Sequence, residues 1–135
     1  MAIRTYRADG TIEVCRFVKP DGTNDFEVIQ AAADEDTLLG ISQEGSYDTP
    51  GLTGSANDAA RDGHLLKVYE TDEDCLLEIG SGGCSPGARL TSDANGAGIA
   101  VSADADHCIG AIALETGLEG ELVRVRVVCV PVKTS

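Results

Sequence analysis

The sequence predicts an all-β fold, a small β-barrel or sandwich of short antiparallel strands. Short runs of β-branched residues alternate with glycine-centred turns, which is typical of strand-turn-strand chains. The clearest run places Val123, Val125 and Val127 on one face of a strand and Arg124 and Arg126 on the other. Aromatic residues make up only 4% and tryptophan is absent, so the core must be built from aliphatic side chains. No segment has the length and periodicity of an amphipathic helix.

The chain of 135 residues is long enough for one domain that buries roughly two thirds of its unfolded surface. We expect residues 1–11 to form an extended N-terminal arm. Residues 12–135 are expected to form a single β domain, with a long loop inserted at about 46–63. This loop carries Pro50, Gly51 and Gly54 and is too long for a plain hairpin connection. We expect it to cross over the barrel or to form outside contacts, with one short helical turn near 57–61.

The individual strands are predicted from alternation and from the turn residues between them. We expect strands at 12–18, 26–31 and 38–42, and a hairpin of 65–69 with 75–79 around the turn 71–74. Turns are predicted at Lys19-Pro20-Asp21-Gly22 and at Gly80-Ser81-Gly82-Gly83. The string Asp93-x-Asn95-Gly96 resembles a fragment of a calcium loop, but it lacks the closing Glu and is also typical of a tight hairpin turn. A turn is therefore predicted there.

The charge balance limits the possible partners. The chain has 10 basic and 23 acidic residues, a net charge of −13, and such a surface repels phosphate, so we expect no nucleic-acid partner. The distribution is uneven, because residues 1–19 carry a net charge of +2 and the remainder carries −15. A basic arm on an acidic body could dock onto an acidic neighbour, including another copy of the chain. Equally, these basic residues could be scattered charges on a strand surface.

The sequence predicts a soluble protein made in the cytoplasm. The first residues lead into no apolar stretch, so we expect no signal peptide. The longest apolar run, 127–132, has six residues, far fewer than the roughly 20 that a membrane helix needs. No membrane partner is expected.

A search for catalytic or metal-binding groups gives no candidates. The five cysteines form no Cys-x-x-Cys pair and are expected to be reduced structural thiols. His107 precedes Cys108, but neighbours on an extended strand point to opposite faces and cannot form a dyad. His64 is expected at a surface or edge. We therefore expect no catalytic residue, no metal site, no cofactor and no enzymatic activity.

The order of these motifs resembles the bacteriophage capsid decoration proteins, which are also called cement or head-stabilising proteins. The segment 39–45, Leu-Gly-Ile-Ser-Gln-Glu-Gly, is similar to the family's "G-[VI]-S-Q-E-G" segment. The segment 86–96 resembles its "G-D-x-L-x-x-D-x-x-G" turn, with Ala88 where the family often has Asp. The resemblance covers nearly the whole chain from about Arg16, and it includes the family's first hairpin, central strands and ending.

The resemblance implies a structural virion protein that binds the outer surface of the assembled capsid. In this reading it acts as a homotrimer near three-fold positions and stabilises the shell against the pressure of packaged DNA. Its partners would be the major capsid protein and copies of itself. It would be located on the outer capsid surface of the virion, and in the host cytoplasm during assembly.

Two regions are predicted to make the contacts with the capsid or with other protomers. The first is the arm, which we expect to pair with a sheet edge on a capsid subunit or neighbouring protomer. The second is the edge of the long loop. The candidate contact residues are Ile3, Arg4, Tyr6, Arg7, Gln43, Glu44 and Tyr47.

Two other classes of function compete with this reading. A small ligand-binding or carbohydrate-binding accessory module would need exposed aromatic rings for stacking, and the chain has only five Phe and Tyr residues, several of them expected in the core. A β-rich enzyme, such as a trimeric nucleotide hydrolase, would need converging acid, base and positioning groups, and the sequence offers no such set.

Overall fold

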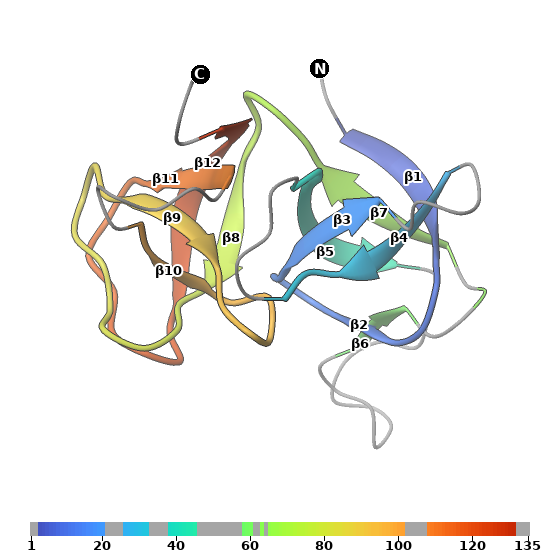
Figure 1. Cartoon of the computed structure of the whole chain (residues 1–135), viewed down its shortest axis with the longest axis horizontal. Helices are drawn as coiled ribbons and strands as arrows, with labels where there is room; N and C mark the ends of the chain where they lie inside the picture. The colour runs from blue at the N-terminus through green and yellow to red at the C-terminus, as the bar shows by residue number, and fades with distance from the viewer. Residues whose placement is uncertain are drawn as a thin grey trace.

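The computed structural model describes residues 3–20, 26–32, 38–45, 58–60, 63, 65–101 and 108–131. Within these ranges all regular secondary structure is β, which confirms the predicted all-β class. Figure 1 shows a barrel beside a second sheet. The strands are β1 (Ile3–Ala8), β2 (Ile12–Glu13), β3 (Phe17–Pro20), β4 (Glu27–Gln30), β5 (Gly40–Gly45), β6 (Asp58–Ala60), β7 (Leu65–Tyr69), β8 (Asp74–Glu78), β9 (Arg89–Ser92), β10 (Gly98–Ala100), β11 (Cys108–Ala113) and β12 (Leu122–Pro131).

The barrel is closed by five strands in the order β1-β4-β3-β5-β7, with β7 returning to β1. Neighbouring strands are antiparallel, except that β1 and β4 run parallel. Closure leaves the barrel without a full-length free edge, which protects it from uncontrolled strand pairing. The interior is aliphatic, and its largest buried members are Ile12, Val18, Val28, Leu66 and Val68.

The second sheet has the order β10-β9-β11-β12-β8 and is antiparallel throughout. The predicted alternation in β12 is confirmed, because Val123, Val125 and Val127 are buried while Arg124 and Arg126 are exposed. The apolar face of this sheet packs against the barrel.

One shared core joins the barrel to the second sheet. Phe17 of β3 and Ile41 of β5 belong to the same buried cluster as Leu77, Leu90 and Val125 of the second sheet. The ring of Phe17 lies directly against Gly110 of β11, where any side chain would overlap it. The two sheets therefore pack as one unit, and the glycine is required by the close approach of the ring.

The predicted arm outside the β domain is corrected by the structure. Ile3–Ala8 form β1, which pairs along its length with β7, from Ile3 opposite Tyr69 to Arg7 opposite Leu65. The backbone of this segment is thus satisfied within its own chain. The sequence pattern did not predict this strand, because only Ala8 is fully buried and β1 therefore has no continuous apolar face.

Two further expectations about strands are wrong. Residues 12–18 do not form one strand, because the chain turns at Val14–Cys15 and Cys15 has a φ of 58° in the left-handed region. The strands β7 and β8 do form near the predicted positions, but not as a hairpin. Each pairs in a different sheet, so the turn between them is the crossover from the barrel to the second sheet.

The long loop also differs from its prediction. In place of a helical turn near 57–61, β6 pairs antiparallel with β2, with Ala60 opposite Ile12. Residues 46–57 of this loop lie outside the described residues, as do His64 and His107.

The turn predictions in the second sheet are confirmed. Gly82 and Gly83 have φ values of 94° and 66°, which glycine adopts readily. At the β9–β10 hairpin, Oδ1 of Asp93 accepts hydrogen bonds from the backbone N–H groups of Asn95 at 2.8 Å and Ala97 at 3.0 Å. Asp93 thus closes a turn.

All five cysteines are free thiols. Burial raises the pKa of the Cys75 and Cys129 thiols to about 12, so both side chains act as small apolar groups in the core. In the part of the chain that the structure describes, no helix is long and apolar enough to cross a bilayer.

Candidate functional site

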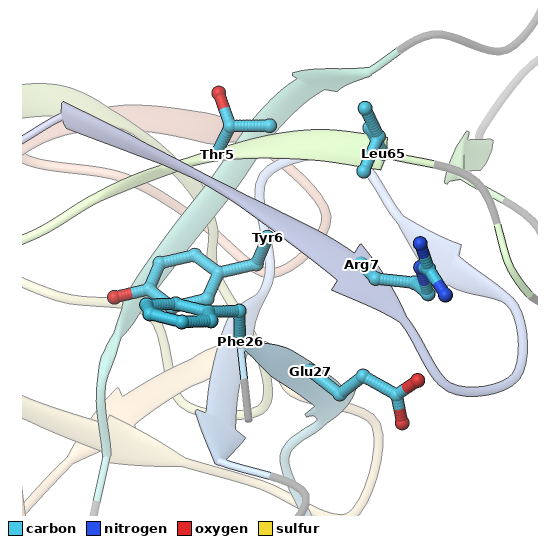
Figure 2. A pocket seen from close by; sticks show the side chains of 6 residues that line it. All are labelled: Thr5, Tyr6, Arg7, Phe26, Glu27 and Leu65. Atoms are coloured by element: carbon cyan, nitrogen blue, oxygen red, sulfur yellow. The ribbon is translucent and has the colours of Figure 1, made fainter. Parts of the chain in front are cut away.

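An open pocket of about 270 Å³ lies on the barrel, where β1 passes the start of β4 (Figure 2). Its walls combine two aromatic rings, one leucine, one threonine and one residue of each charge. They are Thr5, Tyr6, Arg7, Phe26, Glu27 and Leu65. We call this set the β1 pocket.

Phe26 is the most unusual residue of the β1 pocket. It is 76% exposed, although it is the residue immediately before a core strand. Its φ is 60°, in the left-handed region that costs an ordinary side chain about 1–2 kcal/mol. The Phe26 carbonyl accepts a hydrogen bond from Arg7 N–H at 2.8 Å, which fixes this backbone against β1. The strained backbone therefore holds an aromatic ring in solvent.

The rings of Tyr6 and Phe26 lie side by side at the mouth of the pocket (Figure 2). Tyr6 is half-buried and packs against the barrel core, whereas Phe26 projects outward. Together they form an apolar platform, and the side chains of Arg7 and Glu27 emerge beside it. Such a combination of exposed aromatic and arginine side chains is typical of protein contact surfaces.

One edge of β1 is only partly covered. The strand β4 pairs with β1 at Arg7 and Ala8 alone, opposite Glu27 and Val28. The backbone N–H groups of Arg7 and Asp9 point to this side. By strand alternation those of Ile3 and Thr5 point the same way. Among the described residues, no strand pairs with Ile3 or Thr5 on that side.

Glu70 holds the Tyr6 side chain in place. The Tyr6 hydroxyl donates a hydrogen bond to Oε2 of Glu70, and Arg4 Nε lies 3.5 Å from Oε1 of the same carboxylate. Burial, followed by this hydrogen bond and the negative charge of Glu70, raises the pKa of Tyr6 to about 12. The phenol is therefore neutral and fixed as a donor at physiological pH.

The structure brings together the predicted contact residues of the N-terminal segment. Tyr6 and Arg7 line the β1 pocket, and the exposed Ile3 and Arg4 flank it on the same strand. Gln43 lies elsewhere: its amide Nε2 donates to the Leu76 carbonyl at 2.7 Å, so it forms an internal contact between the two sheets.

Glu44 and Tyr47 complete the predicted contact residues. Glu44 lies in β5. Tyr47 lies outside the described residues.

Five residues of the site were not predicted from the sequence: Thr5, Phe26, Glu27, Leu65 and Glu70. Phe26 and Leu65 begin alternating strand patterns, and such residues are usually buried, so nothing local marks them as exposed. Glu70 is 64 positions from Tyr6, and only strand pairing brings the two together. Among the residues that the structure describes, no three His, Cys, Asp or Glu side chains are placed to hold a metal ion.

Comparison with known proteins gives a likeness in structure. No protein-family model matches the chain, and no curated protein matches it at a significant level. Among solved structures, the chain is similar to the crystal structure of the head fiber gp8.5 N base in bacteriophage phi29, with 18% identity and a TM-score of 0.60. The alignment covers 98% of this chain and 98% of that chain. The two chains therefore share a fold along almost their whole length.

Proposed function

We propose that this chain is a structural, non-enzymatic protein of a bacteriophage head that binds the outer surface of the assembled capsid. In this proposal it acts as a homotrimer near three-fold positions, contacts the major capsid protein and stabilises the shell against the pressure of packaged DNA. The observation that carries the proposal is the shared fold with a phage head fiber base over 98% of both chains. The resemblance of the sequence motifs to capsid decoration proteins points the same way.

The physical basis of such stabilisation is mass action. A protein that binds the assembled shell in preference to free subunits shifts the equilibrium toward the shell. A trimer that reaches several capsid subunits at once gains avidity without any new chemistry. The net charge of −13 suits a position outside the shell, away from packaged DNA.

We place the capsid contact at the β1 pocket and the adjoining edge of β1. Phe26 supplies a rigid apolar anchor with 76% of its surface available to a partner. The uncovered edge at Ile3 and Thr5 offers backbone groups to a strand of the capsid subunit. This retains the predicted strand pairing with the capsid and moves it from a free arm to the edge of a barrel strand.

The test is co-sedimentation of the protein with heads purified from the phage whose genome encodes it. We expect the chain to sediment with assembled heads and to stay in the supernatant with unassembled capsid protein. The Phe26→Ala variant should lose binding, while Phe26→Tyr, which keeps the ring, should retain it. Failure of the unaltered protein to bind assembled heads would overturn the proposal.

The alternative function, a ligand-binding or carbohydrate-binding module, has one observation in its favour. The paired rings of Tyr6 and Phe26 stand beside the polar groups of Arg7 and Glu27, an arrangement that suits stacking on a sugar. A glycan array separates the two functions. Saturable binding of a defined glycan that is lost in Phe26→Ala, together with no binding to heads, would favour the module.

A further inference from the structure

The outer face of the second sheet carries three arginines and two exposed leucines, and Asp74 and Glu78 lie on the same face along β8. Leu76 on β8 pairs with Arg124 on β12, and Asp74 pairs with Arg126, which in turn pairs with Ile112 on β11. Ile112 pairs with Arg89 on β9. We define the arginine face as Leu76, Arg89, Leu122, Arg124 and Arg126.

The arginine face is open to solvent among the described residues. Leu76 is 38% exposed and Leu122 is 51% exposed, although both lie in strands. The apolar sides of these same strands are buried in the shared core, so this is the opposite, uncovered side of the sheet. Exposed leucines next to arginines are typical of a protein interface rather than of a solvated sheet surface.

Asp74 is the counterion of Arg126, and the charge of Arg124 also helps to lower the pKa of this carboxyl. Arg126 Nε lies 2.8 Å from Asp74 Oδ1, and its Nη2 lies 3.3 Å from Oδ2, so this charge is already paired. Within the described ranges, the guanidinium groups of Arg89 and Arg124 form no ion pair. Arginine, with its planar and weakly hydrated guanidinium group, suits interface ion pairs better than lysine, and no lysine lies on this face.

The loop between β11 and β12 has the opposite character. It exposes three glutamates around Leu118, which is 68% exposed and so leaves a large apolar side chain in solvent. Glu115 and Glu121 accept hydrogen bonds from the backbone N–H groups of Arg124 and Leu118. Glu119 forms no ion pair within the described residues. We define residues 115–121 as the acidic corner.

We propose that the arginine face of one copy of this chain binds the acidic corner of a second copy. Charge complementarity favours a second copy of the chain as the partner. Apart from these three arginines the chain carries a net charge of −16, so another copy offers an acidic surface to the arginine face. The leucines of the two patches supply the apolar area that such a contact needs. Because face and corner are different surfaces, although Glu115 of the corner contacts the backbone of Arg124, the contact is heterologous, and it gives a closed ring only where the rotation between copies allows closure.

This inference deepens the proposed function, because it names the surface through which copies associate on the capsid. It does not depend on capsid binding, since it is tested on the chain alone. Association can fail while the protein still binds heads, and head binding can fail while association persists.

The test is charge reversal with compensation, read as mass by sedimentation velocity at low ionic strength. We expect the unaltered chain to be oligomeric, and Arg124→Glu and Glu119→Arg each to weaken association at least about tenfold. The double variant, which restores the opposite charges, should recover the oligomer. Lys67→Glu, an equal charge reversal on the barrel, should leave the mass unchanged.

Circular dichroism and thermal melts of each variant establish that a loss of mass is not a loss of fold. A monomeric unaltered chain at the highest concentration, single reversals that keep the full mass, or a double variant that stays dissociated would each overturn the proposal.

Discussion

The side-chain amide of Gln43 forms a two-point hydrogen bond with the backbone of Leu76. Nε2 of Gln43 donates to the Leu76 carbonyl at 2.7 Å, and Oε1 accepts from the Leu76 N–H at 3.3 Å. The strand β8 is the last strand of the second sheet, so this amide takes the place of a neighbouring strand on its outer edge. A backbone bond from Glu78 N–H to the Cys15 carbonyl, at 3.0 Å, extends the same junction. The barrel thereby covers the edge of the second sheet.

Replacing Gln43 should loosen this junction. We expect Gln43→Ala to lower the free energy of unfolding by about 1–2 kcal/mol, because two backbone groups of Leu76 lose their partner. Gln43→Glu should cost more at neutral pH, since it sets a carboxylate against the Leu76 carbonyl. Urea denaturation measures both changes. Equal stability of all three proteins would show that water replaces the amide without cost.

Arg16 links the barrel to the second sheet by charge. Its side chain is 11% exposed, and its guanidinium group lies 3.3 Å from Glu13 and 3.0 Å from Glu78 and donates to the Asn95 carbonyl at 2.8 Å. We expect Arg16→Met to destabilise the protein by about 2–3 kcal/mol, because both carboxylates keep part of their burial without a counterion. Urea denaturation gives the value.

The matched control is Arg126→Met. Arg126 pairs with Asp74 in similar geometry, but the two side chains are 54% and 45% exposed. This change should cost clearly less than Arg16→Met, because an ion pair in solvent is screened and contributes little to stability. Equal costs for the two variants would contradict the role given to burial.

We expect Phe26 to lower the stability of the fold and to be needed for binding to heads. Phe26→Gly relieves the left-handed backbone at φ 60° and removes little buried area, so we expect the protein to gain about 0.5–1 kcal/mol. The same change should abolish co-sedimentation with heads, because the anchor is gone. Thermal melts and the sedimentation assay are read on one preparation. A variant that is both less stable and fully able to bind heads would contradict both expectations.

Tyr6 should make the stability of the barrel sensitive to alkaline pH. Its pKa in the folded protein is about 12, above the ordinary tyrosine value near 10, so folding favours the neutral phenol. Its contribution is complete below pH 10 and is lost as the pH rises toward 12. Thermal melts across this range should show a decline that is smaller in Tyr6→Phe. Absorbance titration of tyrosinate checks the late ionisation directly.

Local sequence patterns were enough to predict the β class, the buried and exposed faces of β12, and the turn at Asp93. Each depends on residues two to four positions apart, and backbone geometry alone decides where their side chains point. The N-terminal segment was also predicted as a contact region from its basic residues, and Tyr6 and Arg7 of this segment line the β1 pocket. Its pairing with another chain stays a prediction.

Which strands share a sheet could not be predicted from local patterns and became clear from the fold. Local alternation does not specify a partner, so β7 and β8 look like a hairpin until their pairing with β1 and β12 places them in different sheets. The same holds for Tyr6 with Glu70 and for Gln43 with Leu76, whose positions are set by closure of the barrel and by the core around Phe17. Pairing and packing energies depend on the sum of many distant contacts. A short stretch of sequence carries too little of that sum to fix the site.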